Sequence, residues 1–245
     1  MYINSQEQSA CMYLDLHARP KNPIILEGFP GYGLVGTIVT EFLIKHLNAK
    51  KIGRIYIDEV TPVVAIHENM PIDPLGIFYD KVHNLVILHA LTTVQGVEWK
   101  LAEQVTQLSK ILKAKEVIGI EGVGNPALGN EEPRMFYIGK GKKFAMIKEL
   151  NKLDEGIIMG VTGALLLRED ITLNCILAET HSQLPDSRAA ARIVQVLDKY
   201  LGLKVDYKPL LKQAEHFETK LRDVIAKSKE AVTSTVKTST QPYFG

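Results

Sequence analysis

The sequence predicts an α/β domain in which a largely parallel sheet is flanked by helices on both faces. Short apolar segments of β type alternate with segments of helical periodicity from residue 23 to about residue 201, an order typical of parallel sheets with crossover helices. The first of these apolar segments runs into a glycine-rich turn and then into an apolar helix. With 245 residues, 46% of them hydrophobic, the chain is long enough for one large domain with an appended helix.

The elements of this domain follow from local patterns. An apolar run over residues 23–27 predicts the first strand, and residues 37–47 predict the helix after the turn. Apolar spacing of three and four residues predicts a long helix over 98–114. A late helix is expected over 186–201, with Asp186 as its N-cap and Gly202 at its end. Further strands are predicted over 54–57, 82–91, 116–121, within 156–167, and over 171–180.

Four segments depart from this alternation. Residues 1–21 are predicted to be an N-terminal extension, and the single domain is placed at residues 22–231. Residues 125–154 are rich in Gly, Pro and Lys, which predicts a hairpin insertion with an exposed edge. Residues 210–231 carry a narrow apolar stripe, which predicts an appended helix that packs on its own domain or on a neighbouring subunit. Residues 232–245 are dominated by Ser, Thr and Lys and predict a flexible tail.

Composition excludes several classes of protein. Lys plus Arg number 29 and Asp plus Glu number 28, so the net charge of +1 argues against a nucleic-acid binder. No apolar run reaches the roughly 18–20 residues that a membrane helix needs, and residues 1–15 lack the pattern of a secretory signal. The two cysteines, Cys11 and Cys175, form no metal or redox motif and fit reduced thiols in a cytoplasmic protein. The seven scattered histidines show no metal-binding spacing, so no metal site is expected.

The glycine-rich turn has two interpretations. Residues 31–36 spell G-x-G-x-x-G after a strand and before a helix, and an acidic residue follows about twenty residues later, which is the pattern of a dinucleotide site. The other interpretation is close packing of helix against sheet, which also requires small residues. A proline directly before the first glycine of the motif departs from the dinucleotide pattern, and we favour the packing role. The residues concerned are Gly28, Pro30, Gly31, Gly33, Gly36 and Asp58.

With these residues in view, the chain resembles the proteasome-assembly-chaperone family in its archaeal-type branch. The block from Gly28 to Gly36 is the most specific match, and the resemblance extends over roughly residues 22–230. The other matching features are Phe78-Tyr79, Trp99, Gly119 to Gly122, Thr162-Gly163, Asp186 with Ala189 to Ala191, and the segment from Gly202 to Leu210.

The resemblance implies an α/β core similar to that of nucleoside phosphorylases, used without known catalysis and without a cofactor. It implies binding to proteasome core-particle α subunits by a homo-oligomer, or by an oligomer with a paralogous chaperone. The remaining alternatives are a nucleotide-dependent enzyme that uses the glycine turn and, from fold analogy alone, a phosphorylase-like hydrolase or transferase.

The C-terminal residues Tyr243, Phe244 and Gly245 are the candidate partner-binding site. An aromatic side chain followed by a free carboxylate suits insertion into an apolar slot beside a lysine. Some archaeal-type relatives end in a hydrophobic–Tyr–X tail that docks between α subunits. Here Phe244 replaces the tyrosine and lacks its hydroxyl, so the strength of docking is the open question.

Overall fold

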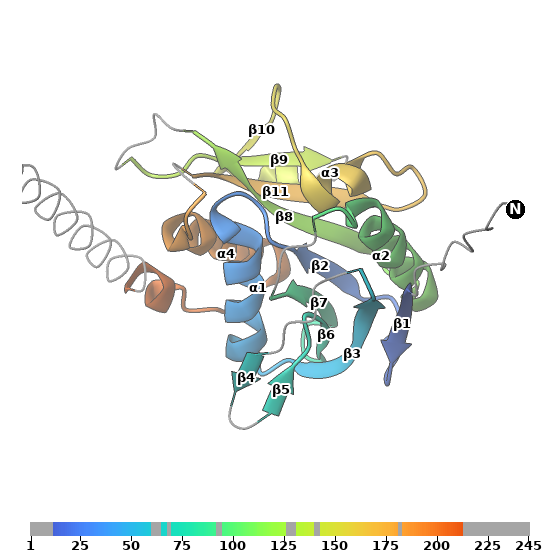
Figure 1. Ribbon diagram of the computed structural model, residues 1–245. Helices are drawn as coiled ribbons and strands as arrows, with labels where there is room; N and C mark the ends of the chain where they lie inside the picture. The colour runs from blue at the N-terminus through green and yellow to red at the C-terminus, as the bar shows by residue number, and fades with distance from the viewer. Residues whose placement is uncertain are drawn as a thin grey trace, which may run out of the picture.

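The computed structural model describes residues 12–59, 65–67, 70–91, 95–125, 131–139, 143–180 and 183–212. A nine-stranded mixed sheet forms its centre, with the strand order β1-β3-β6-β7-β2-β8-β11-β9-β10 (Figure 1). The strands are β1 (Met12–Leu16), β2 (Ile24–Gly28), β3 (Lys50–Ile57), β6 (Leu75–Asp80), β7 (Leu85–Ala90), β8 (Glu116–Gly124), β9 (Met135–Gly139), β10 (Leu150–Lys152) and β11 (Leu173–Thr180). Two short strands, β4 (Ala65–His67) and β5 (Met70–Ile72), pair with each other outside this sheet.

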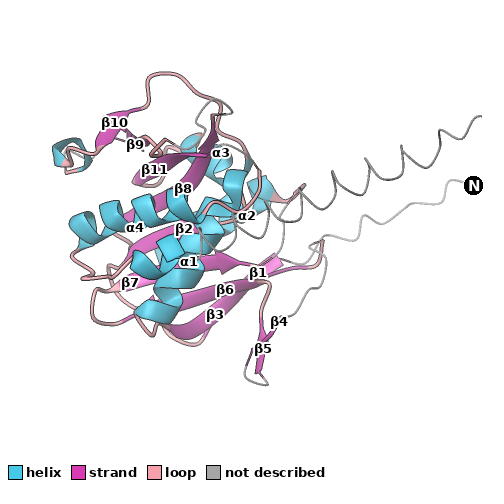
Figure 2. Cartoon of the chain, turned by 90° about the vertical axis from the view of Figure 1, so that its left-hand side faces the viewer, coloured by secondary structure: helices cyan, strands magenta, loops and turns pink. Residues whose placement is uncertain are grey.

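Helices cover both faces of the sheet, as the sequence predicted. The α-helices are α1 (Val35–His46), α2 (Glu98–Leu112), α3 (Gly160–Leu166) and α4 (Ser187–Leu201), and the 3-10 turns are η1 (Tyr32–Leu34) and η2 (Phe144–Met146). Helices α1 and α4 pack together over one face, in front of the strands in Figure 2, and α2 and α3 pack together over the other. The central strands therefore lie between two layers of helix.

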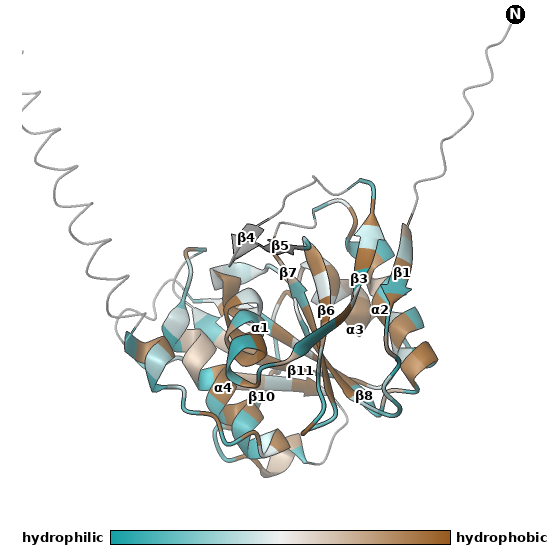
Figure 3. Cartoon of the chain, turned by 90° about the horizontal axis from the view of Figure 1, so that it is seen from below, coloured by the Kyte–Doolittle hydropathy of each residue, from teal (hydrophilic) through white to brown (hydrophobic). Residues whose placement is uncertain are grey.

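The buried side chains explain why the central strands are apolar on both faces. Successive residues of a strand point to opposite sides of a sheet. In β2, Leu26 lies in the core beneath α1 and α4, and Ile25 lies in the core beneath α2 and α3. In β7, Ile87 and Leu88 divide in the same way. Figure 3 shows hydrophobic residues, in brown, along the strands of the sheet, and brown and teal residues in alternation along helices α1 and α4.

The prediction of helix 186–201 with its two ends is confirmed. Asp186 lies just before α4, and its Oδ1 accepts a hydrogen bond from the Ala189 N–H at 2.9 Å, the interaction expected of an N-cap. Gly202 follows the helix with a φ of 72°, a left-handed conformation that glycine adopts without steric cost. Helix α2 and strands β2, β7, β8 and β11 also lie where the sequence places them, apart from small shifts at their ends.

Three structural predictions need correction. The sheet is mixed: β7, β2, β8 and β11 are mutually parallel, but β1, β3, β6 and β7 form successive antiparallel pairs. The segment 156–167 contains α3 in place of a strand, because a short apolar run has no periodicity that separates the two states. The two strands described within residues 125–154 do not pair as a hairpin, since β9 and β10 run parallel to each other and β9 pairs antiparallel with β11.

The two ends of the predicted domain also require comment. Strand β1 pairs with β3 along its whole length, so the sheet begins inside the segment predicted as an N-terminal extension. Residues 208–212 are helical, which agrees with the start of the appended helix. The remainder of residues 210–231, and the tail 232–245, lie outside the described residues. The likeness of the core to nucleoside phosphorylases stays a prediction.

Candidate functional site

The glycine turn has the predicted strand–turn–helix form. Strand β2 ends at Gly28, η1 follows, and α1 begins at Val35. Gly33 has a φ of 66°, which a residue with a Cβ adopts only at a cost. The carbonyl oxygen of Gly33 accepts a hydrogen bond from the Asp186 N–H at 2.9 Å, so the turn is also fixed to the start of α4.

Close packing accounts for Gly28 and Gly36. A Cβ on Gly28 would lie 2.4 Å from the Gly36 carbonyl oxygen, and a Cβ on Gly36 would lie 2.9 Å from the Ile120 carbonyl oxygen. Both contacts are with backbone, which cannot rotate away. The first turn of α1 therefore rests directly on strands β2 and β8, and this geometry agrees with the packing interpretation of the turn.

At Gly31 the turn encloses a carboxyl group of the protein itself. Glu121 Oε1 accepts hydrogen bonds from the Tyr32 N–H at 3.1 Å and from the Gly122 N–H at 3.0 Å. A Cβ on Gly31 would lie 1.9 Å from the same oxygen. In a dinucleotide site the backbone N–H groups of the turn face a phosphate. Here Glu121 takes the Tyr32 N–H group, so the turn lacks a free anion-binding arrangement at this point.

The acidic residue of the nucleotide pattern does not meet the turn. Asp58 follows β3 and is exposed. Strand β3 runs in the same direction as β2, but β6 and β7 lie between them. With neighbouring strands about 4.8 Å apart, that separation is about 14 Å. A dinucleotide site needs the acid on the strand next to the turn, so the G-x-G-x-x-G spacing and Asp58 do not form one here.

A buried pair of carboxyl groups lies beneath the turn, and the candidate residues predicted from the sequence do not include it. Glu27 on β2 and Glu121 on β8 both face α3, where the Thr162 hydroxyl lies 3.2 Å from Glu27 Oε2 and 3.3 Å from Glu121 Oε2. Glu27 Oε1 accepts a hydrogen bond from the Phe29 N–H at 3.1 Å. Neither residue is more than 8% exposed. The available signal was an acid followed by glycine in each of two apolar strands, which becomes informative only once β2 and β8 are known to be neighbours.

Burial controls the protonation of this pair. Desolvation raises the pKa of Glu27 to about 7. Desolvation, with a further contribution from the nearby Glu27 charge, raises the pKa of Glu121 to about 8. Thr162 has a single hydroxyl proton for the two carboxyl groups that it contacts. A proton retained by one carboxyl group lets it donate to the Thr162 oxygen while the Thr162 hydroxyl donates to the other.

A buried histidine lies close to this region. The Thr40 hydroxyl on α1 lies 2.9 Å from Nδ1 of His89 on β7, and the hydroxyl also donates to the Gly36 carbonyl oxygen at 2.9 Å. Burial lowers the pKa of His89 to about 4. The imidazole is therefore neutral at pH 7 and serves the packing of α1 on the sheet.

Residues 25–225 match the PAC2 family. The chain belongs to this family. An uncharacterized protein of Methanocaldococcus jannaschii is 30% identical over 212 residues, which are 83% of this chain and 86% of that protein.

Solved structures of PAC2 relatives support the assignment. Pyrococcus furiosus PbaA, described as an archaeal homolog of proteasome-assembly chaperone, matches with a TM-score of 0.79 and 32% identity over 93% of this chain and 97% of that one. Pyrococcus furiosus PbaB, described as an archaeal proteasome activator, matches with a TM-score of 0.74 and 26% identity over 87% of this chain and 98% of that one. The suspected relationship to archaeal proteasome-assembly-chaperone homologues is thus confirmed.

Several of the residues that carry the family resemblance can be located in the structure. Thr162 lies over the two buried acids, and Gly119 gives them space, because a Cβ there would lie 3.2 Å from Thr162 Cγ2 and 3.3 Å from Glu27 Oε2. Trp99 lies in the first turn of α2 and is 64% exposed. The match between chain and family therefore covers both the glycine turn and a solvent-facing aromatic residue.

The tail residues Tyr243, Phe244 and Gly245 lie outside the described residues, so their role stays a prediction. Within the described part of the chain, no group of three or more His, Cys, Asp or Glu residues could hold a metal ion. None of the helices described there has the length and apolar character needed to cross a bilayer.

Proposed function

We propose that this protein is a non-enzymatic cytoplasmic binding protein that assists assembly or activation of the proteasome by contacting core-particle α subunits. The observation that supports this proposal most directly is the match to PbaA, which extends over 93% of this chain at 32% identity. The match to PbaB, which is described as an archaeal proteasome activator, supports proteasome activation as a second possible role beside assembly. The glycine turn supports a binding role over a nucleotide-dependent one, since Glu121 already occupies the Tyr32 N–H group.

The proposed contact with the α subunits is the C-terminal sequence Tyr243-Phe244-Gly245. Removing one aromatic side chain from water contributes about 2–3 kcal/mol, and the terminal carboxylate can add a charge-assisted hydrogen bond. One tail therefore binds weakly. Several tails on one homo-oligomer, or on an oligomer with a paralogous chaperone, bind much more tightly through their effective concentration.

The test is retention of purified core particle by the immobilised protein and its tail variants. Deleting residues 243–245, or changing Phe244→Ala, is expected to reduce retention at least about tenfold, in line with the loss of about 2 kcal/mol per tail. Adding one residue after Gly245 displaces the carboxylate and has nearly the same expected effect. The matched control is Phe244→Tyr, which keeps the aromatic ring and is expected to preserve or strengthen retention.

The outcomes separate two modes of binding. If the three-residue deletion binds the core particle as well as the unchanged chain, the tail is not the contact, and the folded domain must carry the interaction. If neither form binds, the proposed function fails. Circular dichroism of each variant provides the check that the domain remains folded.

The alternative function is a nucleotide-dependent enzyme that uses Gly31, Gly33, Gly36 and Asp58. Calorimetry with millimolar NAD(P) or ATP tests it directly. No saturable heat is expected, because Glu121 holds the turn and two strands, β6 and β7, separate β2 from the strand that Asp58 follows. A stabilisation of more than about 2 kcal/mol by any of these nucleotides would reverse the ranking of the two functions.

A further inference from the structure

One short element, α3, lies over the carboxyl groups of Glu27 and Glu121. It packs chiefly against α2 and places the Thr162 hydroxyl within 3.3 Å of both groups. Glu27 and Cys175 of β11 are fully buried, and Glu121 is 8% exposed. A Cβ on Gly119 would lie 3.1 Å from Cys175 Sγ, 3.2 Å from Thr162 Cγ2 and 3.3 Å from Glu27 Oε2. Two carboxyl groups and a thiol therefore share one buried space under α3.

No charged group of opposite sign faces this pair within the described part of the chain. The strands beside it contribute groups that are negative or neutral, namely Glu27 from β2, Glu121 from β8 and the Cys175 thiol from β11. The glycine turn and α3 have no charged residue, and His89 of β7 turns to the opposite face, towards α1. The charged residues of α2 make other contacts: Lys100–Glu59, Glu103–Arg168, Lys110–Asp170, and Glu98 with the Gly96 N–H. Ionisation of both carboxyl groups would therefore place two negative charges under α3 without a cation.

Protonation of the pair and closure of α3 are therefore linked. Burial raises the pKa of Glu27 to about 7, and burial together with the Glu27 charge raises the pKa of Glu121 to about 8. In an open state with solvated carboxyl groups, both would titrate near their ordinary value of 4.5. The closed state thus binds more protons than the open state, and a rise in pH favours opening.

The N-terminal end of α3 is the part of this site that can move most easily. Strands β2 and β8 are hydrogen-bonded to a neighbour on each edge, which fixes them in the sheet. Helix α3 has only seven residues and begins at Gly160, which has a φ of 76° and no atom within 4 Å of its Cβ position. In the loop before it, Ile157 and Met159 are 87% and 73% exposed. Segments with so few buried contacts open at low free-energy cost.

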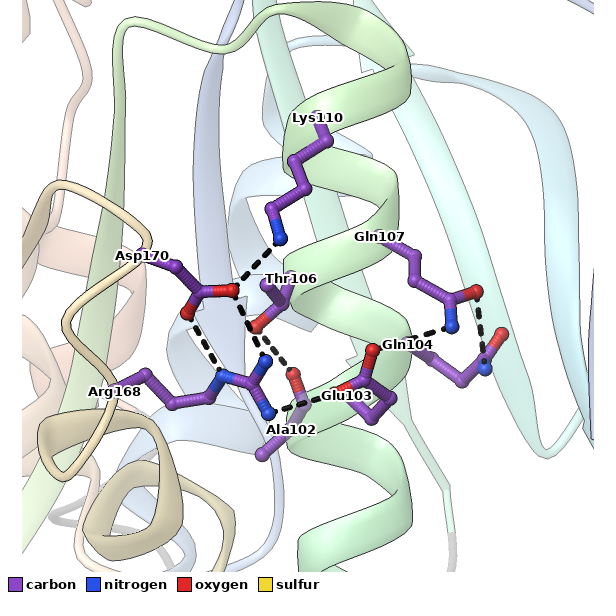
Figure 4. Close-up of polar contacts among 8 residues, drawn as sticks. All are labelled: Ala102, Glu103, Gln104, Thr106, Gln107, Lys110, Arg168 and Asp170. Carbon is purple, nitrogen blue, oxygen red and sulfur yellow. Dashed lines mark hydrogen bonds and ion pairs between the residues drawn. The ribbon is translucent and has the colours of Figure 1, made fainter.

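The C-terminal end of α3 is held more firmly. Figure 4 shows Arg168, just after α3, between Glu103 of α2 and Asp170. The guanidinium lies 2.7 Å from Glu103 Oε2 and 3.0 Å from Asp170 Oδ1, and Lys110 Nζ of α2 lies 2.7 Å from Asp170 Oδ2. Leu165, near the same end, is fully buried in the core beneath α2 and α3. This end is therefore the expected pivot when the other end moves.

The movable end borders a cleft. The cleft has a volume of about 690 Å³ and lies between the glycine turn, the end of β8 and the loop before α3. Glu121, Met159 and Gly160 are among its lining residues. Glu121 belongs both to the cleft and to the buried pair, so displacement of the loop would let water from the cleft reach the pair.

We propose that α3 and residues 156–160 form a pH-sensitive gate on this cleft, closed while Glu27 or Glu121 retains a proton and open when both carboxyl groups are ionised. The open state exposes the Cys175 thiol and enlarges the cleft on its α3 side. The gate needs no partner molecule, so the proposal is independent of the tail and of binding to proteasomes.

The reactivity of the Cys175 thiol tests the gate. The sequence has one other cysteine, so the full chain with Cys11→Ser carries a single, fully buried thiol. Its rate of reaction with a maleimide is measured without denaturant from pH 6.5 to 8. Division by the rate for glutathione at each pH removes the effect of thiolate formation. The corrected rate is expected to rise at least about tenfold over this range.

The double variant Glu27→Gln/Glu121→Gln is the first control, in the same Cys11→Ser chain. Glutamine keeps hydrogen-bond acceptors for the backbone N–H groups that contact the pair, and it cannot ionise. The corrected rate in this variant is expected to change less than about twofold between pH 6.5 and 8.

A thiol on the opposite face of the same strand shows whether the opening is local. Ala178 of β11 is fully buried in the core beneath α1 and α4. With Cys11→Ser and Cys175→Ala, the change Ala178→Cys places the single thiol there. Its corrected rate at pH 8 is expected to be at least about tenfold lower than that of Cys175, because movement of α3 does not uncover this face. Ala190→Cys on α4, where residue 190 is equally buried, replaces this control if Ala178→Cys does not fold.

Three results would each overturn the proposal. The first is a corrected Cys175 rate that stays constant from pH 6.5 to 8. The second is an equal rise in the double glutamine variant, which would assign the pH dependence to other groups. The third is an equal rate for the thiols on the two faces, which would show that Cys175 reacts through unfolding of the whole domain.

Discussion

The two faces of the sheet differ in what they bury. Beneath α1 and α4 the core is built from aliphatic and aromatic side chains, such as Leu26, Ile87 and Phe144, beside the buried pair of Thr40 and His89. Beneath α2 and α3 an apolar core adjoins the carboxyl groups of Glu27 and Glu121, and Trp99 lies exposed above it. The first face thus buries a neutral polar pair within its apolar core, whereas the second buries two carboxyl groups and exposes a tryptophan.

Truncation of an aromatic residue on each face is expected to give the largest contrast. Phe144 is fully buried, with its ring centroid 4.1 Å from that of Tyr200, so Phe144→Ala should lower the free energy of unfolding by about 3–5 kcal/mol. Trp99→Ala removes a ring that is 64% exposed and should cost less than about 0.5 kcal/mol. Chemical denaturation measures both, and similar losses for the two variants would contradict the difference in burial between the two rings.

The pH dependence of stability should report the polar interior beneath α3. The pKa values of Glu27 and Glu121 are raised from 4.5 to about 7 and about 8, so the folded state holds protons that the unfolded chain releases. The free energy of unfolding should therefore fall as pH rises from 4.5 to 8. His89 has the opposite effect below pH 6.5, because its pKa is lowered from 6.5 to about 4. Between pH 6.5 and 8 the two acids dominate, and a loss of about 2 kcal/mol is expected.

The double variant Glu27→Gln/Glu121→Gln is the control for this pH effect. Glutamine keeps an acceptor for the Phe29, Tyr32 and Gly122 N–H groups and cannot ionise. Urea denaturation at pH 6.5 and 8 should give nearly equal free energies of unfolding for the variant. An undiminished slope in the variant would mean that the pH dependence arises from other groups.

Gly31→Ala is expected to have the smallest effect of the three. The φ of Gly31 is −138°, which alanine adopts readily, so backbone strain is not the cause of the loss. The new Cβ would lie 1.9 Å from Glu121 Oε1 and would displace the carboxyl group from the Tyr32 and Gly122 N–H groups. A loss of about 1–2 kcal/mol is expected.

A double-mutant cycle sharpens this prediction. In a Glu121→Ala background the oxygen is absent, so Gly31→Ala should then cost less than about 0.5 kcal/mol. Equal costs in the two backgrounds would show that Glu121 is not what restricts residue 31.

The parts of the fold that local chemistry determines could be predicted from the sequence. The N-cap of Asp186, the end of α4 at Gly202 and the periodicity of α2 each depend on a few neighbouring residues. Strand order depends on contacts across the chain, which is why the largely parallel sheet and the 125–154 hairpin were wrong. The sequence predicts a strand where α3 lies, because the helical state of this segment depends on packing against α2 and the sheet.

The candidate site shows the same limit. The glycine turn could be located, and its packing role inferred, from residues that are close in sequence. Glu27 and Glu121 are 94 positions apart, and only the pairing of β2 with β8 brings them together. Trp99 could be noted as a resembling residue, but its exposure became visible only with the position of α2.

The Tyr32 N–H group donates a hydrogen bond to Glu121, so the carboxyl group that occupies the turn belongs to the same chain. A covalently attached group competes at an effective concentration that, for short connections, reaches millimolar values and above. A free phosphate would have to displace this carboxyl group from the turn and then accept a second negative charge nearby whenever Glu121 ionises. The G-x-G-x-x-G spacing therefore describes, in this chain, an anion site that is saturated by the protein's own side chain before any metabolite arrives.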